Sequence, residues 1–399
     1  MRASGAWFLL FVSLAAASAA DLKVKVVDPQ SAAVPGAQVL LLEDKTASHP
    51  QVELTSAEGL AVFREMAAGP HHVRVLAPGF AVDSTAVSDS ADSVTIQLKW
   101  VTQAQFAGYY VAKDKGFYKA EGLDVTIKPG GPDVAPEQVL IGGGADVVVD
   151  WMPAALAARE KGAPMVNIAQ PFKRSGLELT CRAETGIKKP DDLKGRTLGV
   201  WFSGNEYPFL NWMAKLHFPT DGSPAGVKVV KQGFNVDPLI QKQADCISTM
   251  TYNEYWQVID AGYKPEQLVV FNYTDQGVAT LEDGLYVIED KLKDPAFVDK
   301  MARFVKASMK GWDYARAHPE EAVKIVLDND TTGAQTEHHQ TQTLSEINKL
   351  TEGSDGRLDP AAYQQTVKAL LSSGGSDPVI SKEPTGAYTT AVTDKAVGK

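Results

Sequence analysis

Residues 145–169, ADVVVDWMPAALAAREKGAPMVNIA, decide the fold class of this chain. The apolar run over 145–150 predicts a buried strand, residues 153–161 predict a helix, and residues 165–169 predict a second strand. Two buried strands joined by one helix are typical of parallel sheets, in which the connecting helix covers a face of the sheet. The stretch therefore predicts an α/β architecture.

The alternation of strands and helices continues on both sides of this unit. Before it, the pattern predicts a helix over 106–115 and a strand over 123–127. After residue 194 a second series begins, and it ends in a helix-rich tail. Two successive α/β units could form one large enzyme domain or two lobes around a cleft, and an exported chain favours two lobes. The strands of the second series are predicted at 197–201, 227–231, 246–251 and 268–271, and its helices at 207–216, 237–243 and 254–261.

Residues 21–99 have a different pattern, with short strands and frequent turns. Turn pairs such as Pro35-Gly36 and Pro78-Gly79 separate the strands. Strands at this spacing predict a small all-β sandwich. The order of turns and core positions resembles that of carboxypeptidase-regulatory-like domains, a resemblance that concerns the fold alone and supplies no catalytic residue. The predicted strands cover 22–26, 39–42, 60–63, 72–75 and 94–98, the last of which closes the sandwich.

The first 20 residues predict a signal peptide. Arg2 is followed by an apolar segment over 7–17 and by small residues at 17–20 that suit a cleavage site. The alternative, an N-terminal membrane anchor, is disfavoured because the apolar run is short and no basic residue follows it. We therefore expect a mature chain that begins at Ala20 or Asp21 and that is periplasmic or secreted.

Composition excludes several classes of protein. The 399 residues carry a formal net charge of −10, which argues against a nucleic-acid partner. Two cysteines cannot form a disulfide scaffold or a four-thiolate metal site, and no metal site is expected. Cys181 and Cys246 are expected to lie in different lobes. A bridge between lobes would lock the cleft, so we expect them to be unbridged.

Three tryptophans follow predicted strands at equivalent places in the fold. Trp100, Trp151 and Trp201 lie at or just beyond the carboxyl ends of strands, where open α/β sheets bind their ligands. A tryptophan at any one position is more often a core residue. Three at one edge favour a wall on which a flat, partly polar ring can stack.

Polar residues accompany these tryptophans. Glu254 is the strongest candidate because Tyr252 and Trp256 flank it, and a carboxylate can accept two N–H bonds from an aminopyrimidine-like edge. Each carboxylate could instead be a helix cap. Lys and Arg are absent from the candidates, so we do not expect a permanently anionic solute. The candidate ligand-binding residues are Trp100, Gln105, Tyr109, Asp150, Trp151, Trp201, Ser203, Gly204, Asn205, Tyr252, Glu254 and Glu282.

Several segments carry a family resemblance. Residues 100–112, WVTQAQFAGYYVA, with KGFY at 115–118 and EGLDV at 121–125, resemble periplasmic solute-binding proteins of ABC importers. Residues 191–200, DDLKGRTLGV, resemble the start of the second lobe in these proteins. The branch is the thiamine-pyrimidine-precursor one, hydroxymethylpyrimidine synthase-like and formylaminopyrimidine-binding, within the nitrate, sulfonate and taurine binder superfamily. The resemblance implies a two-lobed type II periplasmic-binding fold over 100–399, with lobe 1 at about 100–194 and 285–399 and lobe 2 at about 195–284.

The fungal relatives in this branch are enzymes, and this chain departs from them. They make hydroxymethylpyrimidine phosphate from pyridoxal phosphate and a histidine of their own chain. Where they carry the cofactor lysine and the consumed histidine, this chain has Asp150 and Ala154, and no cysteine occurs near their iron-binding run, at 278–282. A Schiff base needs an amine and iron needs ligands. We therefore expect no cofactor and no enzymatic activity.

These observations lead us to expect the substrate-binding component of an ABC importer, which captures a small heteroaromatic, pyrimidine-like solute by lobe closure. Its partners would be that solute and a permease in the inner membrane, and we expect a monomer. The alternatives are a pyrimidine-precursor synthase, which is disfavoured, and a binder of riboflavin, sulfonate or taurine. A surface-display protein, suggested by the β-sandwich, would not need the aromatic strand ends.

Overall fold

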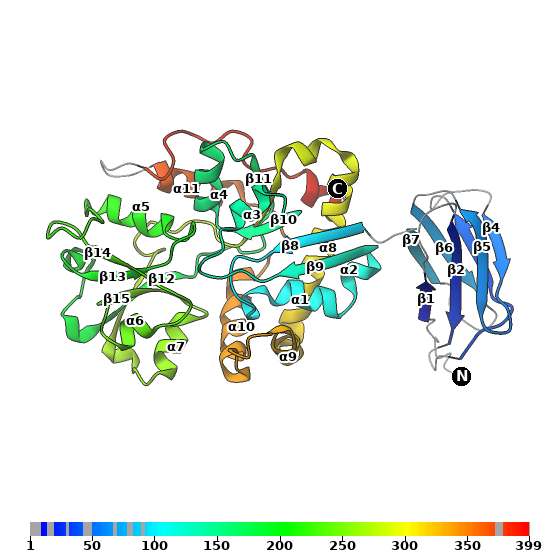
Figure 1. Ribbon diagram of the computed structural model, residues 1–399, viewed down its shortest axis with the longest axis horizontal. Helices are drawn as coiled ribbons and strands as arrows, with labels where there is room; N and C mark the ends of the chain where they lie inside the picture. The colour runs from blue at the N-terminus through cyan, green and yellow to red at the C-terminus, as the bar shows by residue number, and fades with distance from the viewer. Residues whose placement is uncertain are drawn as a thin grey trace. The chain divides into compact units, whose positions relative to one another are not determined.

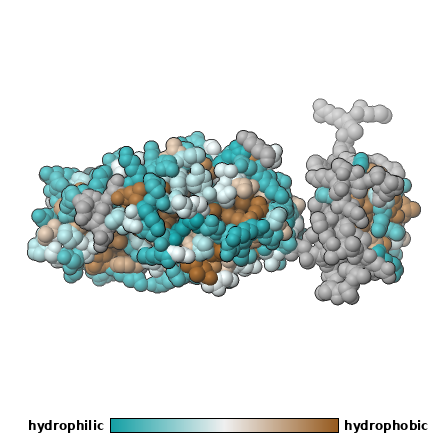
Figure 2. All heavy atoms as spheres, turned by 90° about the horizontal axis from the view of Figure 1, so that it is seen from above, coloured by the Kyte–Doolittle hydropathy of each residue, from teal (hydrophilic) through white to brown (hydrophobic). Residues whose placement is uncertain are grey.

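The computed structural model describes residues 9–13, 20–28, 32–42, 50–66, 70–77, 83–88, 92–371 and 378–398. The chain forms two compact units. One comprises Met1–Ser93 with Tyr118–Asp124, and the other comprises Val94–Phe117 with Val125–Lys399. The face of the larger unit seen in Figure 2 is mainly hydrophilic, with scattered apolar groups. Among the described residues, no helix is both long and apolar enough to cross a membrane.

The N-terminal strands form two antiparallel sheets. One sheet has the order β1-β2-β5 and the other has the order β4-β3-β6-β7. β1 lies within the predicted signal peptide, whose cleavage would remove it. The strands are β1 (Leu9–Ser13), β2 (Ala20–Val27), β3 (Gln38–Leu42), β4 (Gln51–Leu54), β5 (Leu60–Met66), β6 (Pro70–Leu76) and β7 (Asp83–Ser88).

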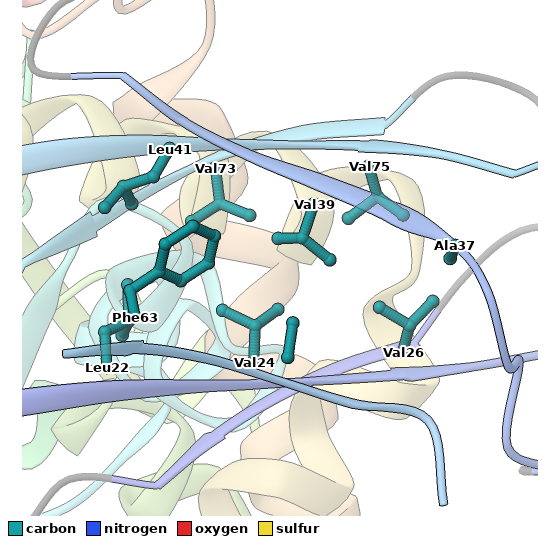
Figure 3. Close-up of a cluster of buried hydrophobic side chains, with 10 residues drawn as sticks. Leu22, Val24, Val26, Ala37, Val39, Leu41, Phe63, Val73 and Val75 are labelled. Carbon is teal, nitrogen blue, oxygen red and sulfur yellow. The ribbon is translucent and has the colours of Figure 1, made fainter. Parts of the chain in front are cut away.

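Alternation along these strands places one apolar face of each sheet in a shared core. Val24 and Val26 of β2 are buried, whereas Lys25 between them is exposed. Figure 3 shows the buried side chains of β2 together with Val39 and Val73 of the other sheet. Burial of each such side chain contributes about 1.5–3 kcal/mol. The period-two pattern of the sequence is therefore the source of this core.

Lobe 1 of the larger unit is built on a five-stranded sheet with the order β11-β17-β10-β8-β9. β10 runs parallel to β8, and β17 lies between β10 and β11, antiparallel to both. The strand-helix-strand unit at 145–169 is thus confirmed as a parallel arrangement, but the returning chain inserts β17 between its two strands. The strands are β8 (Asp92–Gln97), β9 (Leu123–Lys128), β10 (Val147–Asp150), β11 (Met165–Ala169) and β17 (Gly284–Ile288).

The strand predicted at 94–98 is assigned to the wrong sheet by the sequence pattern. It corresponds to β8, which pairs with β10 of lobe 1 through Ile96 with Val147 and Gln97 with Val148. Local alternation identifies a strand but not its partner, because register and pairing depend on residues far away in the sequence. β8, which lies before Trp100, is therefore part of the lobe 1 sheet, and the strand that the sequence also predicts at 98–101 does not form.

Lobe 2 is built on a second five-stranded sheet, with the order β14-β13-β15-β12-β16. β12 was not predicted, and it falls within the residues that the sequence assigns to lobe 1. Lobe 2 therefore begins at β12, earlier than the predicted boundary near residue 195. Figure 1 shows the two lobes of the larger unit, each with its own sheet. The strands are β12 (Leu177–Arg182), β13 (Thr197–Val200), β14 (Lys228–Lys231), β15 (Cys246–Met250) and β16 (Leu268–Asn272).

Helices cover these sheets, and two of them pack through glycines. A Cβ atom on Gly311 would lie 2.0 Å from the carbonyl oxygen of Gly108, so α1 and α8 approach closely only because both residues are glycine. The α-helices are α1 (Ala107–Asp114), α2 (Phe117–Ala120), α3 (Pro136–Ile141), α4 (Met152–Glu160), α5 (Tyr207–Lys215), α6 (Asp237–Ile240), α7 (Glu254–Asp260), α8 (Pro295–Ala317), α9 (Pro319–Asn329), α10 (Glu337–Thr351), α11 (Pro360–Leu371) and α12 (Ala391–Ala396). Short 3-10 helices are η1 (Ala104–Phe106), η2 (Ala183–Thr185), η3 (Pro190–Leu193), η4 (Pro265–Gln267) and η5 (Glu289–Lys293).

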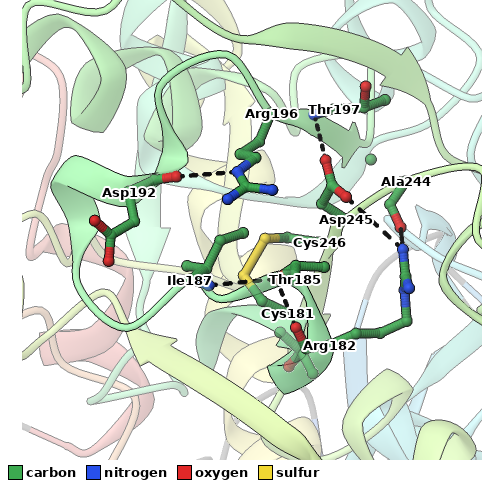
Figure 4. The surroundings of a disulfide bond; sticks show 12 residues. Cys181, Arg182, Thr185, Ile187, Asp192, Arg196, Thr197, Ala244, Asp245 and Cys246 are labelled. Carbon is green, nitrogen blue, oxygen red and sulfur yellow. Dashed lines mark hydrogen bonds and ion pairs between the residues drawn. A yellow bond between two sulfur atoms is a disulfide. The ribbon is translucent and has the colours of Figure 1, made fainter.

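The two cysteines form a disulfide, which corrects the expectation that they are unbridged. Cys181 lies in β12 and Cys246 lies directly opposite it in β15. The expectation failed because β12 belongs to lobe 2, so both cysteines share one sheet (Figure 4). A bridge within one lobe leaves the movement of the two lobes free.

We expect the disulfide to stabilise lobe 2 without affecting ligand binding. The bridge closes a loop of 65 residues, so the paired variant C181A/C246A should lose about 4 kcal/mol in its free energy of unfolding. Urea titration of native and variant protein measures this loss. Ligand affinity measured by calorimetry should agree within about twofold, since the bridge does not line the cavity described below. A large loss of affinity in a folded variant would contradict this separation.

Candidate ligand-binding site

A small cavity of about 20 Å³ lies between the two lobes. Seven of the twelve predicted residues line it: Trp100, Gln105, Trp151, Trp201, Asn205, Tyr252 and Glu254. Four further lining residues were not predicted: Lys99, Gln103, Met250 and Asn253. Both lobes contribute, since the residues up to 151 belong to lobe 1 and those from 201 belong to lobe 2.

The lining aromatic residues come from strand ends, as the sequence indicates. Trp100 follows β8, Trp151 follows β10, and Trp201 follows β13. The rings of Trp100 and Trp201 meet across the two lobes, with centroids 5.7 Å apart and planes inclined at 65°. The strand-end rule thus brought together side chains that lie up to 101 positions apart in the sequence.

A buried carboxylate fixes the orientation of Trp151. Asp283 accepts a hydrogen bond of 2.8 Å from the indole Nε1 of Trp151 and one of 2.7 Å from Nε2 of Gln105. Burial raises the pKa of Asp283 to about 6. Asp283 has a φ angle of +31°, an uncommon value for a residue with a side chain. Both lobe 1 side chains are therefore held in place by a residue just before β17.

Glu254, the strongest sequence candidate, begins α7 and is 1% exposed. Its carboxylate accepts a 3.0 Å hydrogen bond from the Met250 backbone N–H and a 2.7 Å bond from Nδ2 of Asn253. Burial raises the pKa of Glu254 to about 7. The backbone N–H of Glu254 also interacts with this carboxylate, so one of its four acceptor positions is left for a donor on a ligand.

Asn253 connects this carboxylate to the other lobe. Because its amide nitrogen donates to Glu254, its Oδ1 faces His339, whose Nε2 donates to it at 2.7 Å. His339 lies on α10, which packs against η1 of lobe 1. The pKa of His339 is lowered by burial, which favours the neutral ring. The two lobes are thus joined by a hydrogen bond one residue away from Glu254.

Asp150 does not line the cavity, in contrast to the expectation from sequence. It is fully buried beneath the wall, where Oδ1 accepts a 2.6 Å bond from Nζ of Lys99 and a 2.8 Å bond from the Trp151 backbone N–H. Lys99 itself reaches the cavity. The expectation that the site holds no basic residue is therefore wrong, although the ion pair balances the charge of Lys99.

The other predicted residues lie outside the cavity. Tyr109 packs edge-on against Trp312, with ring centroids 5.7 Å apart. The Ser203 hydroxyl donates to the carbonyl oxygen of Pro132 at 3.2 Å. Gly204 has a φ angle of +91°, and a Cβ atom there would lie 3.0 Å from Cβ of Ala154 in lobe 1. Ser203 and Gly204 therefore serve the contact between the lobes.

Glu282 has a structural role at the connections between the lobes. Its carboxylate accepts hydrogen bonds from the hydroxyl of Ser175 and, at 2.9 Å, from the backbone N–H of Gly176. Ser175 lies on the segment that enters lobe 2, and Glu282 lies on the segment that returns from it. Burial raises the pKa of Glu282 to about 8. The carboxylate therefore ties the two connecting segments together.

A second cavity of about 300 Å³ adjoins the first. Trp100, Gln103 and Asn253 line both cavities, and His339 and the exposed Phe234 line the outer one. The His339 to Asn253 hydrogen bond therefore stands at the boundary between the inner and the outer space.

Known proteins resemble this chain over the larger unit. Residues 103–322 match the family described as NMT1/THI5 like. The formylaminopyrimidine-binding protein of Halalkalibacterium halodurans is 24% identical over 294 residues, which cover 72% of this chain and 87% of the relative. A 4-amino-5-hydroxymethyl-2-methylpyrimidine phosphate synthase of Saccharomyces cerevisiae is 26% identical over 257 residues, which cover 60% of this chain and 72% of that enzyme.

A solved structure supports the same fold. A Candida albicans protein, described as having the generic periplasmic binding protein fold, has a TM-score of 0.53 at 15% identity, covering 77% of this chain and 94% of the other. At this identity the similarity concerns the fold, and it agrees with the two sheet-containing lobes described above. The larger unit therefore has a periplasmic-binding-protein-like α/β fold. Because the matched residues 103–322 span more than half of the sequence, the chain belongs to the NMT1/THI5-like family.

Proposed function

We propose that the protein is the solute-binding component of an ABC importer and that it captures a small heteroaromatic, pyrimidine-like solute by lobe closure. The observation that carries the proposal is the cavity with walls from both lobes. A ligand that contacts both walls binds the closed form more tightly than the open form. That difference in affinity shifts the population to the closed form, which a permease can recognise.

The chemistry of the walls supports a planar ring with hydrogen-bond donors on its edge. Tryptophan rings provide stacking surfaces for a flat ligand. Glu254 provides a buried acceptor, and leaving it without donors is unfavourable. An aminopyrimidine combines both features. The named ligand of the Halalkalibacterium relative belongs to the same chemical class.

The remaining parts of the chain fit an exported binding protein. We propose that residues 1–20 are a cleaved signal peptide and that the mature protein is a monomer in the periplasm, or secreted, which delivers its solute to an inner-membrane permease. The N-terminal unit, up to the residues before β8, is proposed to be a carboxypeptidase-regulatory-like β-sandwich. Intact-mass measurement of the exported protein tests the cleavage, since retention of the first 19 residues would contradict it.

The synthase alternative has less support from the site. The position of the enzyme lysine holds Asp150, whose carboxylate forms an ion pair with Lys99. Nζ of Lys99 thus donates to Asp150, so it is not a free amine available for a Schiff base. Incubation with pyridoxal phosphate and iron should leave the masses of the chain and of the cofactor unchanged. Formation of a pyrimidine product would contradict the binding-protein proposal.

Calorimetry with a panel of solutes tests the proposed function directly. Amino- and formylamino-pyrimidines should bind tightly and quench tryptophan fluorescence. Nitrate, sulfonates and taurine should bind weakly, because Asp150 already neutralises the cation in the cavity. Tight binding of taurine together with weak binding of every pyrimidine would overturn the assignment.

Replacement of Trp201 by alanine should weaken pyrimidine binding by about 1–2 kcal/mol, because a stacking surface and buried apolar area are lost. Calorimetry measures the change. A matched control is Trp256→Ala, which removes another lobe 2 tryptophan that is outside the cavity and donates to the Thr251 carbonyl at 2.8 Å. Equal losses in the two variants would show that Trp201 acts through stability alone.

A further inference from the structure

Lys99 is a residue of the cavity wall, and its ammonium group pairs with the buried carboxylate of Asp150. The residue follows β8, is 1% exposed and lies beside Trp100 and Gln105 in the lining. Among the described residues its Nζ has one hydrogen-bond acceptor, Asp150 Oδ1 at 2.6 Å. The ring of Trp151 lies 5.1 Å from the same nitrogen. An ammonium has three N–H donors, so this buried cation has donors left for a ligand.

The side-chain amides of two nearby lobe 1 residues already donate hydrogen bonds to other residues of the wall. Nε2 of Gln105 donates to Asp283 at 2.7 Å, and Nε2 of Gln103 donates to Oε1 of Gln105 at 2.7 Å. Lys99 is thus the charged donor of the lobe 1 wall. The lobe 2 wall carries Glu254, a group that only accepts when ionised. The two lobes therefore offer opposite hydrogen-bonding character to whatever lies between them.

The carboxyl groups around Lys99 determine whether an anionic or a neutral hydrogen-bond acceptor is favoured beside it. Asp150 is fully buried and already balances the ammonium. Glu137 and Asp283 are further buried carboxyl groups that interact electrostatically with Lys99 and Asp150. An anionic ligand would therefore add negative charge to a site whose cation is already paired, and burying an unpaired charge is costly. A neutral acceptor adds no charge to the site.

We infer that Lys99 forms a subsite for a neutral carbonyl oxygen on the same ligand whose donor edge meets Glu254. This inference rests on the proposed function and narrows it. The ligand is a neutral heteroaromatic with an acceptor edge toward lobe 1 and an amino edge toward lobe 2. Such a ligand completes hydrogen bonds of both lobes only when they are closed around it.

A matched pair of small probes tests the subsite. Cytosine and 4-aminopyrimidine share the ring and the amino group, and they differ in the carbonyl that only cytosine carries. The native protein should bind cytosine about tenfold more tightly than 4-aminopyrimidine, because the second ligand leaves a buried donor unpaired. Orotate, a pyrimidine with a carboxylate, should bind more weakly than cytosine. Calorimetry at pH 8 measures all three affinities.

Substitutions at Lys99 test whether the preference for cytosine over 4-aminopyrimidine depends on this residue. In K99M/D150N both charges are removed together, so no buried charge is left alone, and the preference for cytosine should fall to within about twofold. K99Q keeps an uncharged donor and should retain part of the preference. The control K194M replaces an exposed lysine and should behave like the native protein. Thermal melting checks that each variant is folded, and the preference of the native protein is informative by itself should K99M/D150N not fold.

The outcomes separate this inference from the proposed function. Equal affinities for cytosine and 4-aminopyrimidine in the native protein, an unchanged preference in folded K99M/D150N, or tighter binding of orotate would each overturn the subsite while pyrimidine binding stands. Failure of every pyrimidine to bind the native protein would overturn the proposed function and the subsite together.

Discussion

A fragment that starts at Trp100 should neither fold nor bind ligand, whereas a fragment that starts at residue 91 should do both. The difference between them is β8, which lies between β9 and β10 in the lobe 1 sheet. Without it, both neighbours lose their pairing partner. The fragment would also lose Lys99 from the wall of the cavity.

The energy involved is comparable with the stability of a whole domain. Val94, Ile96 and Leu98 are all almost fully buried. At about 1.5–3 kcal/mol for each side chain, their removal costs roughly 5–9 kcal/mol, against a typical total of about 5–15 kcal/mol. Circular dichroism during heating should show a cooperative transition for residues 91–399 and none for residues 100–399. Native-like melting and ligand affinity of the shorter fragment would show that β8 is dispensable.

This truncation also shows where sequence-based prediction of the fold succeeds and where it fails. The residues of β8 have a clear strand pattern, and the strand is there. Its sheet could not be predicted, because its partner Val147 lies about 50 residues further along the chain. β12 was not predicted as a strand, and its residues were assigned to lobe 1, although it pairs with β15 and β16 of lobe 2. Placing β12 in lobe 1 led directly to the wrong expectation for Cys181 and Cys246.

The sequence predicted those site residues whose position follows from the order of strands and helices alone. Trp151 and Trp201 follow strands, and the carboxyl ends of these strands face the cavity between the lobes. Which polar residue next to a strand end reaches the cavity depends on pairing across the fold. Asp150 was chosen and lies behind the wall, while its partner Lys99, 51 positions earlier, reaches the cavity. Contacts between residues far apart in the sequence determine which of the two side chains reaches the cavity, and no local sequence pattern indicates this.

Replacement of Glu254 by alanine should weaken pyrimidine binding by about 3 kcal/mol, which is more than 100-fold. The loss is large because the proposed ligand amino group would lose its buried acceptor. The Met250 backbone N–H and the Asn253 amide lose the same acceptor with and without ligand, so their loss lowers stability and not affinity. Glu254→Gln keeps one oxygen acceptor and should lose less. The matched control is Glu178→Gln, which alters a half-buried carboxyl whose pKa burial also raises to about 7 and which does not line the cavity. Calorimetry should show native affinity for that control.

The pH dependence of binding gives a second measure of the same residue. Burial raises the pKa of Glu254 from 4.5 to about 7, so the ligand-free protein retains the proton until the pH approaches 7, and its stability falls as pH rises from about 4.5 to 7. A ligand amino group needs the carboxylate, so binding must release that proton at lower pH. Affinity should therefore fall by about tenfold between pH 8 and pH 6, and calorimetry at pH 6 in two buffers of different ionisation enthalpy should detect release of a proton. Glu254→Gln should remove the Glu254 contribution to both effects, and the Glu178→Gln control should retain it. Unchanged pH dependence in Glu254→Gln would mean that Asp283 or Glu137, whose pKa values are also raised, titrates in its place.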